Sequence, residues 1–193
     1  MKHIRTALIL LAAAAASNCA APEPPGNVEN ACAILKDRPQ WGRALDRAAI
    51  RWGAPQHVAM AIIWKESSFE ADAKTSRKYV LGFIPNGRRS SAYGFAQAID
   101  GTWDWYRDST GNSGADRDDF DDAADFVGWY MARSQASAGI GMDDAYNQYL
   151  AYHEGHTGFR RQSWQSKPWL MRVAAEVKRK AEDFERQIAA CRT

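Results

Sequence analysis

Glu66 is the residue best placed to do chemistry, because it follows the apolar run AIIWK and precedes SSF. We expect a helix from Pro55 to about Ser67, on which Val58, Ile62 and Glu66 are spaced four residues apart. Glu66 therefore shares the face that the apolar residues bury. Burial raises the pKa of a carboxyl, and the negative C-terminal end of the helix acts in the same direction. A carboxyl that keeps its proton at neutral pH is what a general acid requires.

The alternative for Glu66 is a structural role, in which its stem packs and its carboxylate reaches solvent. Two other polar clusters offer different chemistry. HEGH, from His153 to His156, lacks the H-E-x-x-H spacing and an evident third ligand, so we expect no metal there. DRDDFDDAAD, starting at Asp116, lacks the glycine of a calcium loop and is expected to be a solvated helix start. It could instead supply a second catalytic carboxylate, as an inverting hydrolase needs.

The elements that must position these residues are helical, and strand alternation is absent. Prolines and glycines mark the helix ends, and apolar residues at helical spacing mark the buried faces. The sequence therefore predicts an all-α domain spanning residues 32–193. Helices are expected at 39–53, at 55–67, around Trp103, at 120–137, from about Asp143 to Gly155, and from Pro168 onward.

The first residues have the pattern of an exported chain. Lys2 and Arg5 precede a short apolar run, so residues 1–18 are expected to be a signal peptide. Cys19 stands where a lipoprotein is cut and acylated, and the proline-rich residues 19–31 suit a flexible tether. Without Lys2 and Arg5 the basic and acidic residues are equal in number, so the charge gives no reason to expect a nucleic-acid partner.

Cys32 opens the folded part of the chain and Cys191 nearly closes it. Cys191 continues the apolar stripe of the last helix, which includes Val177, Phe184 and Ile188. An oxidising compartment favours a disulfide between the two cysteines, with Cys19 left over for lipid. Three unrelated free thiols are the alternative.

Three short motifs occur in order on the expected helix, loop and helix. They are Glu66-Ser67, then Gly94-Phe95-Ala96-Gln97 within SAYGFAQ, and then Ala151-Tyr152-His153 close to Gly155. Together they resemble the lytic transglycosylases of the soluble type, whose catalytic domain is lysozyme-like. The resemblance covers about residues 55–159. Two departures are that Phe95-Ala96 replaces Leu-Met and that His153 replaces an asparagine.

The resemblance implies a periplasmic enzyme that cleaves peptidoglycan glycan strands, and lipid on Cys19 would anchor it to the outer membrane. Glu66 would protonate the bond between N-acetylmuramic acid and N-acetylglucosamine and then assist closure of a 1,6-anhydro ring, without a cofactor. We expect a monomer. The alternatives are a water-using muramidase and a non-catalytic peptidoglycan-binding lipoprotein. The residues expected to bind substrate are Ser67, Tyr93, Gly94, Gln97, Tyr152 and His153. For Ser67 and Gly94 a purely structural role is equally supported.

The segment from Tyr79 to Arg89, YVLGFIPNGRR, is unusually apolar for a loop that should border the cleft. We expect its side chains to pack back onto the domain, because apolar loop residues usually find local cover. The alternative is a lid or docking surface at the glycan groove, with Arg88 and Arg89 meeting carboxylates of the stem peptides. Several tryptophans could also stack on sugars, although most are expected in the core. They include Trp41, Trp64, Trp103, Trp105 and Trp129.

Overall fold

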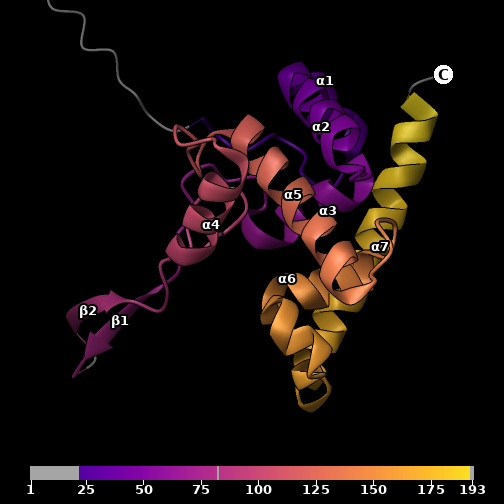
Figure 1. The fold of residues 1–193 in the computed structure, drawn as a ribbon. Coiled ribbons are helices and arrows are strands. Elements are labelled where there is room, and N and C mark those ends of the chain that lie inside the picture. Colours follow the sequence, from indigo (N-terminus) through magenta and orange to yellow (C-terminus); the bar gives the residue numbers. More distant parts are fainter. Residues whose placement is uncertain (1–21, 82, 192–193) are drawn as a thin grey trace, which may run out of the picture.

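The computed structural model describes residues 22–81 and 83–191, and this part of the chain is a helical domain with one small hairpin (Figure 1). The predicted all-α class is confirmed. The helices are α1 (Ala31–Asp37), α2 (Pro39–Trp52), α3 (Gln56–Ser67), α4 (Asp100–Thr110), α5 (Phe120–Ala138), α6 (Ala145–Arg160), the 3₁₀ helix η1 (Ser163–Ser166) and α7 (Pro168–Cys191). The strands β1 (Arg77–Val80) and β2 (Ile84–Arg88) pair antiparallel.

Helix α3 occupies the centre of the domain. Residues 58–63 are all buried, so this helix is apolar on every side, as expected of a helix that packs within a core. It contacts α2, α5, α6 and α7. The helix ends at Ser68, whose backbone is left-handed (φ 53°) and whose N–H donates to the carbonyl of Trp64. The central position of α3 carries Glu66, in its last turn, to the edge of the core.

Most helix boundaries follow the proline and glycine signals. Helix α2 begins at Pro39 and ends at Gly53, which is left-handed (φ 74°). Helix α5 begins after Asp119, whose carboxylate accepts hydrogen bonds from the N–H groups of two residues in the first turn. Gly155 interrupts α6 with φ 72° and ψ 157°, but helical turns resume beyond it to Arg160. The predicted stop at Gly155 is therefore a break within α6.

Helix α1 was not predicted, because its seven residues are too few to display a helical repeat. Asn30 caps it by accepting from the N–H of Ala33 at 2.9 Å. Part of the predicted tether also lies against the domain, since Val28 packs on the core and Glu29 forms an ion pair with Lys180. The predicted signal peptide, 1–18, and Cys19 lie outside the described residues. None of the helices described is long and apolar enough to cross a membrane.

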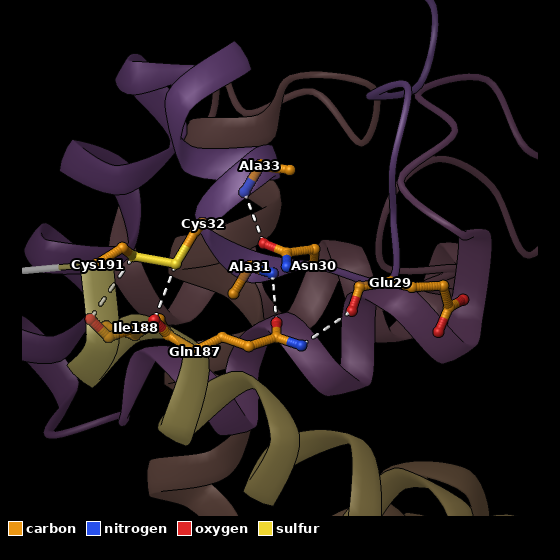
Figure 2. The surroundings of a disulfide bond; sticks show 8 residues. All are labelled: Glu29, Asn30, Ala31, Cys32, Ala33, Gln187, Ile188 and Cys191. Atoms are coloured by element: carbon orange, nitrogen blue, oxygen red, sulfur yellow. Dashed lines mark hydrogen bonds between the residues drawn. A yellow bond between two sulfur atoms is a disulfide. The ribbon is translucent and has the colours of Figure 1, made fainter.

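The predicted pair of cysteines is bridged. Cys32 of α1 and Cys191 of α7 form a disulfide with 6.0 Å between their Cα atoms, although Cys191 itself is exposed (Figure 2). Gln187, one turn earlier on α7, reinforces the junction. Its side-chain oxygen accepts from the N–H of Ala31 at 2.7 Å and its amide nitrogen donates to the carbonyl of Glu29 at 3.3 Å (Figure 2). The N-terminal end of α1 is thereby fixed to the last turns of α7.

The hairpin corrects two expectations about residues 79–89. This segment was predicted to contain no strand, but most of it lies in β1 and β2, with Val80 opposite Ile84 and Arg77 opposite Arg88. Proline and glycine within β2 hid the strand pattern. The expectation that its apolar side chains pack back onto the domain is wrong, because they are exposed by 45–77%. These side chains belong to Val80, Leu81, Phe83 and Ile84.

Removing the disulfide should destabilise the domain. The bridge closes a loop of 159 residues, and in the chain-entropy treatment such a closure contributes up to about 5 kcal/mol. We expect the double substitution Cys32→Ala and Cys191→Ala to lower the free energy of unfolding in urea by about 2–5 kcal/mol. Dithiothreitol is the control, since it should lower the stability of the wild type and leave the variant unchanged. Equal stability of the two oxidised proteins would contradict a structural role for the bridge.

Candidate active site

A cleft of about 520 Å³ lies beside the C-terminal end of α3. One wall comes from the chain between the hairpin and α4, and the other from α5 and α6. Four of the seven residues predicted for catalysis or substrate binding line it: Glu66, Gln97, Tyr152 and His153. The structure also places Tyr130, Glu154, Thr75 and Ser90 in its lining. Residues far apart in sequence thus meet at one hollow.

The carboxyl of Glu66 lies at this cleft, and its environment favours the protonated form. Although the residue as a whole is partly exposed, burial of the carboxyl raises its pKa to about 7. A hydrogen bond from the Tyr149 hydroxyl and the positive charge of Lys65 act in the opposite direction but are weaker. Lys65 itself is paired with Glu176 of α7 at 2.6 Å. At neutral pH Glu66 therefore holds its proton in a large fraction of molecules.

An aromatic cluster fixes the end of α3 that carries Glu66. Phe69, just beyond the helix, is fully buried and left-handed (φ 64°). Its ring stacks with Trp41 of α2 at 5.8 Å between centroids. Trp41 also stacks on Phe120 of α5 at 4.1 Å and meets the edge of Phe95 at 5.4 Å. The cluster of Trp41, Phe69, Phe95 and Phe120 therefore ties α3 to both walls of the cleft.

The loop from Gly94 to Gln97 is held between two elements. The hydroxyl of Tyr152, on α6, donates to the carbonyl of Ala96 at 2.5 Å. The Gln97 side chain donates to the carbonyls of Ala73 and Gly94 at 2.8 and 2.9 Å. Burial raises the pKa of Tyr152 well above its usual value, so its hydroxyl keeps its proton. Tyr152 thus joins the two walls of the cleft by a hydrogen bond to backbone, while Gln97 ties the loop to the chain at Ala73.

Gly94 is required by the protein backbone and does not line the cleft. It is left-handed (φ 77°), and an added Cβ would lie 2.0 Å from the carbonyl oxygen of Arg117. The same oxygen accepts the N–H of Phe95 at 3.1 Å. The guanidinium of Arg117 donates to the carbonyl of Ala98 at 2.9 Å and pairs with Asp100 at 2.9 Å. Arg117 therefore encloses the loop from its outer side, and only glycine leaves room for it.

Ser67 and Tyr93 also lie away from the cleft. The buried Ser67 hydroxyl donates to the carbonyl of Ile63, one turn earlier on its own helix, at 3.2 Å. The Tyr93 hydroxyl donates to Asp118 at 2.9 Å, and its ring packs against the cationic groups of Lys74 and Arg117. These contacts give both residues structural functions, as they support the end of α3 and the outer side of the Gly94 loop.

A second carboxylate, Glu154, faces the cleft and is ionised. Lys167 binds both of its oxygens, at 2.7 and 3.0 Å, while Ser163 and His153 hydrogen-bond to it. Burial alone would raise its pKa, but the hydrogen bonds from Lys167, Ser163 and His153 outweigh this and lower the pKa to about 2. His153 also meets the edge of the Trp169 ring at 5.1 Å. Glu154 is thus occupied by partners within the protein.

The other polar clusters have local roles. The acids of DRDDFDDAAD stand outside the cleft: Asp119 caps α5, Asp121 pairs with Arg47, and Asp125 accepts from the Tyr106 hydroxyl at 2.8 Å. Within the described residues, no group of three or more histidine, cysteine and acidic side chains is arranged to hold a metal.

The histidine at the end of HEGH is a packing residue. The ring of His156 stacks on Tyr130 at 4.4 Å and its Nε2 lies 3.0 Å from the Ser134 hydroxyl. Burial lowers the pKa of His156. The ring is therefore a neutral support behind Tyr130, which forms part of the cleft wall.

The five tryptophans considered for sugar stacking are not part of the cleft lining. Trp41, Trp103 and Trp129 are buried in the core, and Trp64 is partly covered by Lys180. Trp105 is more exposed and packs edge-on against Trp129 at 4.6 Å. The expectation that most of them belong to the core is therefore met.

Comparison with known families identifies the family of the chain. The family model described as Transglycosylase SLT domain matches residues 7–191, nearly the whole chain. A search of curated proteins finds no match. The chain belongs to the transglycosylase SLT domain family, and its function is therefore of the lytic transglycosylase type, directed at peptidoglycan.

Substitution of Gly94 by alanine should disrupt the cleft wall. The new Cβ would overlap the Arg117 carbonyl, and the alanine would have to keep the left-handed backbone of Gly94. We therefore expect a loss of about 2–5 kcal/mol in unfolding free energy. Gly139→Ala is a matched control, because Gly139 has a similar φ of 68° but no neighbour within 4 Å of the added atom. It should lose only about 1–2 kcal/mol. Equal losses in urea denaturation would show that the Arg117 contact is unimportant.

The raised pKa of Glu66 should make stability depend on pH. Between its ordinary value of 4.5 and about 7 the folded chain holds a proton that the unfolded chain has released, so stability falls as pH rises through this range. Glu66→Gln removes that loss. We expect its melting temperature to exceed the wild-type value by an amount that grows from pH 4.5 to 7 and then levels off. Glu70→Gln, at an exposed position, is the control, and the same pH dependence there would refute the assignment.

Proposed function

We propose that this protein is a lytic transglycosylase in which Glu66 is the single catalytic acid and base. The observation that carries the proposal is a carboxyl held at the cleft with its pKa raised by burial to about 7. A group with this pKa can both give and take a proton near neutral pH.

The reaction follows from these two proton states. Glu66 donates its proton to the oxygen that joins N-acetylmuramic acid to N-acetylglucosamine, and the bond from that oxygen to the muramic C1 breaks. The Glu66 carboxylate then removes the proton from the muramic 6-hydroxyl as that oxygen bonds to C1. The products are a free 4-hydroxyl on N-acetylglucosamine and a 1,6-anhydromuramoyl end. No water is consumed, and Glu66 regains its proton.

The state of Glu154 favours this route over a water-using muramidase. An inverting hydrolase needs a second carboxylate free to activate water. Glu154 is a carboxylate in the same cleft, but Lys167 and Ser163 occupy it and its low pKa makes it a weak base. Glu154 is better suited to positioning His153 at the cleft wall.

We assign substrate contacts to the residues that line the cleft with polar groups. Both amide hydrogens of Gln97 are used within the protein, which leaves its oxygen to accept from a sugar hydroxyl. His153 is partly exposed and can donate to a sugar oxygen or carboxylate. Tyr152 contributes its ring while its hydroxyl holds Ala96. For Tyr149 we propose a positioning role, since its hydroxyl orients the Glu66 carboxyl.

The location follows from the substrate. An enzyme of this family acts where peptidoglycan lies, in the periplasm or cell-wall region. We propose that residues 1–18 direct export and that Cys19 is acylated, which would anchor the monomeric domain to the outer membrane.

The decisive experiment is digestion of purified sacculi by Glu66→Gln. The amide has almost the same shape as the carboxyl but cannot exchange the proton, so we expect a loss of at least about 10²–10⁴-fold in released muropeptides. Mass spectrometry of the wild-type products should find ends lighter by one water than hydrolysed ends. Glu70→Gln, on the exposed surface just beyond α3, should keep wild-type activity.

Each alternative has its own outcome in this experiment. Products that carry the full mass of water would point to a muramidase. Retained glycan binding without soluble products, in wild type and Glu66→Gln alike, would point to a binding protein. Normal release of anhydromuropeptides by Glu66→Gln would reject Glu66 as the catalytic group.

A further inference from the structure

The β1–β2 hairpin extends away from the helices (Figure 1). Its two strands pair with each other, and neither packs extensively against a described helix. The side chains at its tip are the largest group of neighbouring exposed apolar residues in the described chain. They are Val80, Leu81, Phe83 and Ile84, and Leu81 and Phe83 are more than 70% exposed.

The turn at this tip does not require apolar side chains. Leu81 occupies a left-handed turn position (φ 54°) in which glycine or asparagine is usual, and its side chain is 77% exposed. Polar residues would close the same turn without exposing apolar surface to water. The side chains at the tip are therefore suited to contact something outside the domain.

The charge around the tip has one sign. From Ala73 to Ile99 the chain contains no acidic residue, although acids and bases are nearly balanced over the whole sequence. The basic residues of this stretch lie in or close to the two strands, behind the apolar tip. They are Lys74, Arg77, Lys78, Arg88 and Arg89.

We propose that the hairpin binds the surface of an anionic phospholipid bilayer, with the tip inserted into the interface and the basic residues at the headgroups. Apolar side chains at the tip with basic residues behind them match the order of acyl chains and phosphates in a bilayer. A protein partner is less well matched, because a standard interface buries about 800 Å² on each side and four side chains at a hairpin tip offer much less.

This contact would place the cleft beside the membrane. Thr75 and Ser90 line the cleft at the base of the hairpin, where the Thr75 hydroxyl donates to the Ser90 carbonyl at 3.0 Å. Glycan strands close to the bilayer would therefore be the ones presented to Glu66. The membrane contact itself uses no residue of the proposed reaction, so it can be tested separately from the proposed function.

The test measures lipid contact at the tip directly. In the full chain carrying Cys19→Ser, which removes the site of acylation, Leu81→Cys is labelled with the fluorophore NBD, while the bridged Cys32 and Cys191 do not react. Vesicles of phosphatidylcholine and phosphatidylglycerol at 3:1 should shift the emission to shorter wavelength, and doxyl-labelled lipid should quench it. Ile50→Cys, an exposed apolar position on α2, is the matched control. Its NBD label should keep the emission of a fluorophore in water, with or without vesicles.

Charge variants test the role of the basic residues behind the tip. In the Leu81→Cys protein, Lys78→Gln with Arg89→Gln should raise the lipid concentration for half-maximal shift by about 25-fold, or about fivefold for each charge. Arg172→Gln with Arg179→Gln, at exposed positions of α7, removes the same charge and should leave the lipid concentration for half-maximal shift unchanged. The proposal is overturned if position 81 remains in water on these vesicles, which would favour a protein partner. It is equally overturned if positions 81 and 50 respond alike.

Discussion

The stacking of aromatic rings around Trp41 is the interaction on which the site depends. Trp41 comes from α2, Phe69 follows α3, Phe95 belongs to the Gly94 loop and Phe120 begins α5, and their centroids lie 4.1–5.8 Å from Trp41. Three of these segments, α3, the Gly94 loop and α5, also contribute residues to the cleft, so the cluster holds together parts of the chain that form its lining. The position of Glu66 and the shape of the loop opposite it are consequences of this packing.

Within that frame the cleft keeps two carboxyl groups in opposite states. Burial raises the pKa of Glu66 to about 7, so this carboxyl is protonated in a large fraction of molecules at neutral pH, whereas Glu154, despite its burial, has a pKa lowered to about 2 by hydrogen bonds from its neighbours and is ionised. The contrast arises from neighbours, since both residues are glutamates at the ends or bends of helices. One carboxyl therefore exists in both proton states near neutral pH, while the other is held ionised by its contacts with His153 and Lys167.

Most of the fold, but only part of the site, could be predicted from the sequence. Pro39, Gly53 and Pro168 act locally, so helix ends at these positions could be predicted from the chain itself. Glu66, Gln97, Tyr152 and His153 lie in recognisable motifs and do line the cleft. The reason for Gly94 could not be found in this way, because the atom that excludes a Cβ belongs to Arg117. Glu154 was considered only within the HEGH motif, and its pairing at the cleft was not predicted because Lys167 comes from beyond α6. The hairpin was not predicted because proline and glycine interrupt its strand.

The disulfide between α1 and α7 has a mechanical consequence. Cys32 and Cys191 are separated by 159 positions, so nearly the whole domain forms one covalently closed ring. Tension applied between the two ends of the chain would pass through the sulfur atoms at this junction and bypass the ring. The cleft, Glu66 and the aromatic cluster all lie inside the ring. If the domain is pulled at its two ends, the disulfide junction therefore bears the tension, and the cleft and the aromatic cluster do not.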